Sequence, residues 1–126
     1  MPRTAEASPD ALLPSCPSRS ILSRIGQKWT LLAIVALREE TLRFGDIRRR
    51  IHGVSDKMLT QTLRSMERDG LVQRHAYDPR QQRVEYGLSP LAQSLLPIVA
   101  ELKQWAERSS EIIESSNQAF DRKSAL

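Results

Sequence analysis

One short stretch of the chain concentrates side chains that can bond to nucleic-acid bases and phosphates. Lysine and arginine bond to guanine edges or to phosphates, and glutamine bonds to adenine. The residues of this kind recur three, four or seven positions apart, on one side of a helix: Lys57, Thr60, Gln61, Arg64 and Arg68. An ordinary solvated helix surface has a similar composition, so the meaning of this face depends on what surrounds it.

The same stretch, residues 54–71, has the signals of a helix with two defined ends. Ser55 suits the N-cap, because its hydroxyl can accept a free amide of the first turn. Val54 can pack against Leu59 as a hydrophobic staple, and Gly70 stands where a left-handed residue ends a helix. The apolar positions that we expect to face a core are Leu59, Leu63 and Met66.

The positive charge of the protein is concentrated around this helix. The chain of 126 residues has a net charge of +4. Residues 42–83 contain ten Lys and Arg against five Asp and Glu, whereas the remainder contains nine against ten. Concentrated basic charge is the pattern expected of a protein that binds a polyanion.

Composition narrows the class of protein further. At 126 residues and 40% hydrophobic content, the chain suits one globular domain with a modest core. No apolar run has the length of a membrane span or of a signal-peptide core, so we expect a cytoplasmic protein with no membrane partner. The single Cys16 excludes an internal disulfide, and with only His52 and His75 beside it we expect no metal site and no cofactor.

The N-terminal region is predicted to hold a disordered arm and then a helix. Residues 1–15 are rich in proline and small polar residues, which favours disorder. Cys16 and Pro17 suit the start of a helix that ends at Gly26. A helix N-terminus favours a thiolate and would lower the pKa of Cys16, which suggests a redox or electrophile sensor; a half-buried structural cysteine is the alternative. The apolar stripe of this helix is Ile21, Leu22 and Ile25.

Two further helices are predicted before the basic one. Residues 28–37 are apolar nearly all round, so this helix should be buried, with part of it covered by a second subunit. Leu42 and Arg43 suit a short strand, and a short helix follows with apolar residues at Phe44, Ile47 and Ile51. A short helix, a turn containing Gly53 and a second helix with a polar outer face form the helix-turn-helix pattern.

A β-hairpin is predicted after the basic helix. Residues 71–77 and 83–88 alternate as strands do, and the loop between them contains Pro79. A hairpin in this position is a wing. Arg80 and Arg83 flank its tip, where they could contact the minor groove or phosphates.

The last helix has more apolar surface than a small core requires. Its seam consists of Leu91, Leu95, Ile98, Leu102, Trp105 and Ile112. We interpret the surplus as a dimer surface. Pro97 should kink or split this helix, at a cost of about 3 kcal/mol if unrelieved. We expect the folded domain to cover residues 16–115 and residues 116–126 to form a polar tail.

Together these motifs resemble the HxlR-type winged-helix regulators, which are close in architecture to the MarR group. The matching motifs are Cys16-Pro17, Ile25-Gly26-Gln27-Lys28-Trp29-Thr30-Leu31-Leu32, Arg43-Phe44-Gly45-Asp46-Ile47-Arg48, Ser55-Asp56-Lys57-Met58-Leu59-Thr60-Gln61-Thr62-Leu63, Asp69-Gly70-Leu71-Val72 and Arg83-Val84-Glu85-Tyr86. They follow the family's order and cover roughly residues 16–108.

The resemblance implies a mainly α-helical fold with a small β-hairpin, and N- and C-terminal helices for dimerisation. It implies a homodimeric bacterial transcription factor, usually a repressor, with helix 55–69 in the major groove of a near-palindromic operator and hairpin 71–88 as the wing. Some members sense electrophiles or oxidants through a cysteine placed like Cys16, which implies an oxidant or small-molecule effector. The loop of residues 78–82 departs from the more proline-rich loop usual in the family.

These arguments yield two sets of site residues and leave two alternatives. The predicted DNA-contacting residues are Arg43, Ser55, Lys57, Thr60, Gln61, Arg64, Arg68, Arg80 and Arg83. The predicted dimer residues are Ile21, Leu22, Ile25, Leu95, Ile98, Leu102 and Trp105.

One alternative function is a winged-helix protein-interaction module that binds no DNA, against which the basic helix face argues. The other is an enzyme with Cys16 as nucleophile, for which the neighbouring sequence offers no paired histidine; we therefore expect no enzyme.

Overall fold

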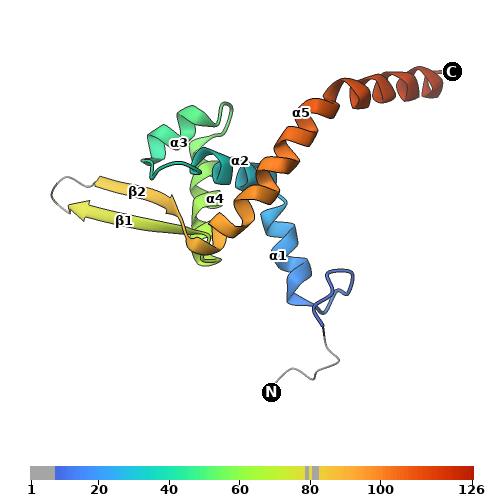
Figure 1. Cartoon of the computed structure of the whole chain (residues 1–126). Helices are drawn as coiled ribbons and strands as arrows, with labels where there is room; N and C mark the ends of the chain where they lie inside the picture. Colours follow the sequence, from blue (N-terminus) through green and yellow to red (C-terminus); the bar gives the residue numbers. More distant parts are fainter. Residues whose placement is uncertain (1–7, 79, 81–82) are drawn as a thin grey trace.

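The computed structural model of the chain describes residues 8–78, 80 and 83–126. Its elements are α1 (Pro17–Ile25), α2 (Lys28–Ala36), α3 (Phe44–Arg50), α4 (Asp56–Arg68), β1 (Val72–Asp78), β2 (Arg83–Leu88) and α5 (Pro90–Ser124). In Figure 1, α2, α3 and α4 lie together, and the hairpin, α1 and most of α5 project from them in different directions. The predicted mainly α-helical fold with one β-hairpin is confirmed.

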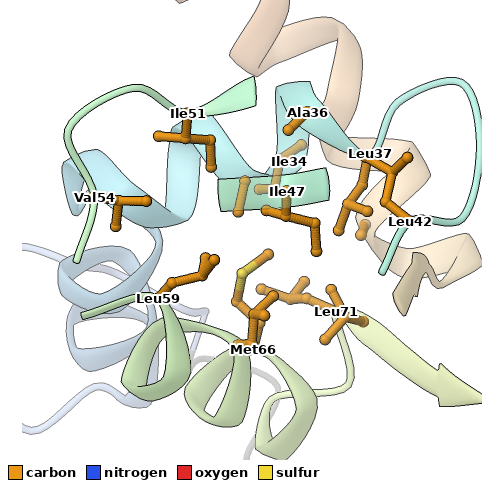
Figure 2. Packing of buried hydrophobic residues seen from close by; sticks show 14 of the residues in the cluster. Ile34, Ala36, Leu37, Leu42, Ile47, Ile51, Val54, Leu59, Met66 and Leu71 are labelled. Carbon is orange, nitrogen blue, oxygen red and sulfur yellow. The ribbon is translucent and has the colours of Figure 1, made fainter. Parts of the chain in front are cut away.

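The core lies between α4 on one side and α2 and α3 on the other (Figure 2). Ile34 of α2 and Ile47 of α3 have no exposed surface. The three apolar residues predicted to face the core from α4 are Leu59, Leu63 and Met66, and they are 0%, 2% and 1% exposed. Burial of a side chain of this size contributes about 1.5–3 kcal/mol, so this packing determines which face of α4 remains outside.

Both ends of α4 are formed as the sequence predicts. The Ser55 hydroxyl accepts the amide of Met58 at 3.1 Å. At the other end Gly70 has a φ of +77°. Its amide donates to the carbonyl of Glu67 at 3.0 Å, and the amide of Leu71 donates to that of Met66 at 2.8 Å. This pair of bonds is a Schellman motif, which satisfies the last carbonyls and directs the chain into β1.

The wing is an antiparallel pair in which Val72 lies opposite Leu88. The predicted strand at residues 42–43 is reduced to one bridge, because α3 begins immediately afterwards. Leu42 exchanges two backbone hydrogen bonds with Tyr86, at 2.9 and 2.8 Å. Gly87 permits this close approach, since a Cβ there would lie 2.8 Å from the Thr41 side chain. The bridge ties the base of the wing to the segment before α3.

The last helix, α5, is longer than the sequence pattern suggested. Its 35 residues extend about 52 Å at 1.5 Å per residue. Pro97 lies inside it without splitting it, although the axis changes direction along its length (Figure 1). The segment predicted as a polar tail, residues 116–126, is helical as far as Ser124, because it contains neither Gly nor Pro to end the helix.

The N-terminal segment leads directly into α1. Of the predicted arm, residues 1–7 lie outside the described part of the chain. From residue 8 the backbone forms turns, in which the amide of Leu13 donates to Asp10 and that of Cys16 donates to Leu13, both at 3.1 Å. Among the described residues, no helix is long and apolar enough to cross a membrane, and no three His, Cys, Asp or Glu side chains are grouped as metal ligands would be.

Candidate nucleic-acid interface

The outward face of α4 carries the side chains predicted to read bases. Because Leu59, Leu63 and Met66 face the core, the opposite side of α4 faces away from it. All of the predicted contacts on this helix are exposed: Lys57, Thr60, Gln61, Arg64 and Arg68. They give this face three cations and one side-chain amide.

The long polar side chains of this face have no hydrogen-bond or ion-pair partner among the described residues. Within residues 8–78, 80 and 83–126, no carboxylate pairs with Lys57, Arg64 or Arg68. The Gln61 amide likewise makes no intramolecular hydrogen bond with any described residue. An unpaired donor at the surface is available to an external acceptor, and a phosphate or base edge is the acceptor that suits three cations on one face.

The arginines of α3 differ, because each has a partner. Arg48 donates to Asp56 at 2.8 Å, which joins α3 to the first turn of α4. This pair also places a positive charge beside the Asp56 carboxylate, which would otherwise repel a phosphate near the start of α4. The remaining pairs are Arg49 with Asp46 and Arg50 with Glu40. Of these three pairs only that of Arg48 joins the two helices of the motif; the Arg49 pair lies within α3, and the Arg50 pair joins α3 to the segment before it.

Arg43 and Ser55 occupy the starts of the two helices of the motif. Arg43 is the exposed N-cap residue of α3. The Ser55 hydroxyl accepts an amide as the cap of α4, and its own hydrogen remains able to donate to an acceptor outside. Ser55 borders the exposed face of α4, Arg43 is exposed at the start of α3, and both stay in the proposed DNA-contacting set.

The wing carries two of the predicted contacts. Arg83 begins β2, and its side chain is 47% exposed with Glu85 at 3.5 Å. An exposed pair of this kind contributes little stability, so it leaves Arg83 able to exchange partners. Arg80 is exposed. The rest of the tip, at positions 79, 81 and 82, lies outside the described residues, and with it most of the predicted loop.

Cys16 is the N-cap residue of α1, as predicted. Its sulfur accepts the amide of Asp10 at 3.3 Å and lies 2.9 Å from the Ser18 hydroxyl. The residue is partly buried. In Figure 1 this end of α1 points away from the hairpin, so any effect of Cys16 on DNA binding would act over a distance.

Most of the predicted dimer residues are exposed on α1 and α5. On α1, Ile21 is 43% and Leu22 is 60% exposed; the exposed ones on α5 are Ile98, Leu102 and Trp105, at 65%, 49% and 51%. Ile25 and Leu95 instead pack partly against the core. A groove of about 400 Å³ runs between the two helices, and its apolar lining includes Ile21, Ile25, Leu91, Leu95 and Ile98.

Comparison with known proteins places this geometry in context. The model of the HxlR-like helix-turn-helix family matches residues 24–114. The chain is 48% identical over 92 residues to the uncharacterized HTH-type transcriptional regulator YtfH of Escherichia coli (strain K12), covering 73% of each protein. A solved structure, the putative transcriptional regulator ytfH from Salmonella typhimurium, has a TM-score of 0.80 at 37% identity, covering 88% of this chain and 99% of that one. A solved structure of the redox regulator HypR in its oxidized form has a TM-score of 0.68 at 35% identity, covering 74% of this chain and 96% of that one.

Proposed function

Because this chain belongs to the HxlR-like helix-turn-helix family and is a DNA-binding transcriptional regulator, we propose that it acts as a homodimeric repressor of a near-palindromic operator. The observation that carries the proposal is the outward face of α4, with three cations and a glutamine amide that no described residue binds. The ion pair of Arg48 with Asp56 supports it, because it joins α3 to α4 without using the side chains of that face.

In this proposal α4 lies in the major groove. The groove is about 12 Å wide and admits an α-helix, and α4 offers 13 residues with one polar side. Arg64 and Gln61 lie midway along this side and are assigned to base edges. Lys57 and Arg68 lie nearer its ends and are assigned to phosphates, with Arg80 and Arg83 on the wing. Phosphate contacts of this kind fix the register of a protein on the duplex.

Dimerisation is inferred from the apolar surfaces of α1 and α5. Leu22, Ile98 and Trp105 are each at least half exposed, and the groove between the two helices is mainly apolar. A second copy would remove this surface from water. A two-fold dimer would place two α4 helices about 34–36 Å apart, one turn of DNA, and so require inverted half-sites.

Sedimentation and salt titration test the dimer and its DNA binding together. Sedimentation velocity at micromolar concentration should give a dimer. Fluorescence anisotropy on the operator should show affinity that falls steeply with salt, since phosphate contacts release counterions. A monomer, or binding indifferent to both salt and sequence, would contradict the proposal.

A second function, regulation by oxidation at Cys16, is supported by the similarity to the redox regulator HypR. Cys16 stands at the start of α1, and its sulfur accepts the amide of Asp10. As the only cysteine in the chain, it would give a sulfenic acid, an alkylated thiol, a mixed disulfide, or a disulfide joining two copies. Any of these would alter the start of a helix that we propose to lie in the dimer interface.

Diamide treatment tests the oxidation proposal. Diamide removes two electrons and two protons from a pair of thiols and leaves a disulfide. Operator binding should fall with diamide in the wild type and stay constant in the Cys16→Ser variant. An equal response in the two proteins would leave Cys16 a structural residue.

A further inference from the structure

The junction that follows α4 is tied to two helices that the helix-turn-helix motif does not include. Asp69 is the C-cap of α4, and the next two residues lead into the wing. The Ser89 hydroxyl donates to the carbonyl of Gly70 at 2.6 Å, and its amide donates to that of Leu71 at 2.9 Å. Because Ser89 is also the N-cap of α5, the start of α5 is bonded to Gly70 and Leu71, the residues that join α4 to the wing.

Arg24 makes the corresponding link from α1. Its Nε donates to Asp69 Oδ2 at 2.8 Å, and its Nη2 donates to Oδ1 at 3.1 Å. The third nitrogen, Nη1, donates to the Ser20 hydroxyl one turn earlier at 2.7 Å. The hydrogen bond to Asp69 raises the pKa of Arg24, a group that is already charged at neutral pH. A two-pronged pair of this kind fixes orientation as well as distance.

This link matters because little else in the described part of the chain holds α1. The helix has no buried residue of its own, and only Gly26 and Gln27 separate it from α2. The Arg24 and Asp69 side chains are 33% and 18% exposed, so theirs is the least exposed ion pair among the described residues. Without it, α1 would be held mainly by the partial burial of Ile25 and could rotate at the two-residue connection.

We infer that Arg24 is a positioning residue for DNA reading. It ties α1 through Asp69 to the C-terminal end of α4 and so sets the spacing of the two α4 helices in the dimer. The inference rests on the proposed homodimer, in which α1 belongs to the interface. Two-fold symmetry doubles any rotation of α1 relative to α4. The protein would then read half-site spacing through a contact that touches no DNA.

A spacing series tests this role. The operator recovered by selection is synthesised with one base pair added to or removed from its centre, and affinities are measured for the wild type, Arg24→Ala and Arg24→Lys. The wild type should prefer the natural spacing. Both variants should lose about tenfold of that preference, because lysine keeps the charge but not the two-pronged geometry. Affinity for a single half-site should remain unchanged.

The controls separate positioning from stability. Arg38→Ala removes an equally charged side chain whose only carboxylate among the described residues is Glu39 at 3.6 Å, and it should keep the spacing preference. Asp69→Asn breaks the pair from the other side and should reproduce the effect of Arg24→Ala. The inference would be overturned by a uniform loss of affinity at every spacing. It would also be overturned by an Arg24 variant that unfolds at a lower denaturant concentration yet keeps the wild-type preference for spacing. A wild type that is monomeric or shows no preference would overturn the proposed function as well.

Discussion

Replacing Arg64 by alanine tests the reading face of α4 most sharply. Arg64 is exposed, faces away from the buried Leu63 and Met66, and pairs with no carboxylate of the described chain. Its removal therefore breaks no hydrogen bond or ion pair among the described residues, and the free energy of unfolding should change by at most about 0.5 kcal/mol. If the guanidinium bonds to a base edge, the substitution should cost about 1–3 kcal/mol of operator binding, or roughly 5- to 150-fold in affinity.

The assay must distinguish a base contact from a phosphate contact. Anisotropy titrations would compare the operator with variants changed at one base pair in each half-site. Arg64→Ala should lose the discrimination at one position and keep it at the others. Arg83→Ala, on the wing, should weaken binding to every sequence alike and reduce the salt slope by about 1.

A control for charge alone is Arg122→Ala, since Arg122 lies in the last turn of α5, far from α4 in Figure 1. This variant should bind the operator like the wild type apart from a small change at low salt. If Arg64→Ala weakens all sequences equally, as Arg83→Ala should, the assignment of the α4 face to base reading is refuted.

Three further substitutions have expected outcomes of their own. Leu63→Ala should lower the free energy of unfolding by about 2–5 kcal/mol, measured by urea denaturation. Met58 is 39% exposed, so Met58→Ala should change this free energy by less than about 1 kcal/mol. Equal losses in the two variants would show that the buried side of α4 is wrongly assigned. Gly70→Ala should cost about 1–2 kcal/mol, because its φ of +77° strains any L side chain although nothing obstructs the Cβ, and an unchanged unfolding midpoint would contradict this. Ile98→Asp should leave the monomer folded, since the side chain is 65% exposed, yet shift sedimentation from dimer to monomer; a persistent dimer would exclude this face of α5 from the interface.

The local features of the fold were predictable because each depends on neighbouring residues. A serine before the first turn and a glycine after the last determine the ends of α4, and both behave as expected. The spacing of Leu59, Leu63 and Met66 likewise identified the buried side of the helix. Once that side was known, the opposite side followed, and with it the candidate DNA contacts of α4.

The features that escaped prediction involve residues distant in sequence or the absence of a stop signal. Nothing in the spacing of Arg24 and Asp69, 45 positions apart, indicates that they meet. The pair of Arg48 with Asp56 spans a turn whose geometry only the folded chain defines. The helical state of residues 116–124 was not evident from the sequence, because a polar composition does not end a helix when the residues remain competent to form one.

The measurement that tests the central claim most directly is the recovery of genomic fragments bound by the purified protein. Sequencing them should reveal an inverted repeat whose half-site centres are about 10–10.5 base pairs apart, or a multiple of that distance. The same selection with Gln61→Ala and with Arg64→Ala should yield an inverted repeat that has lost its base preference at specific positions in both half-sites. Fragments with no common motif, or a motif without inverted symmetry that both variants recover unchanged, would contradict a dimer that reads DNA through α4.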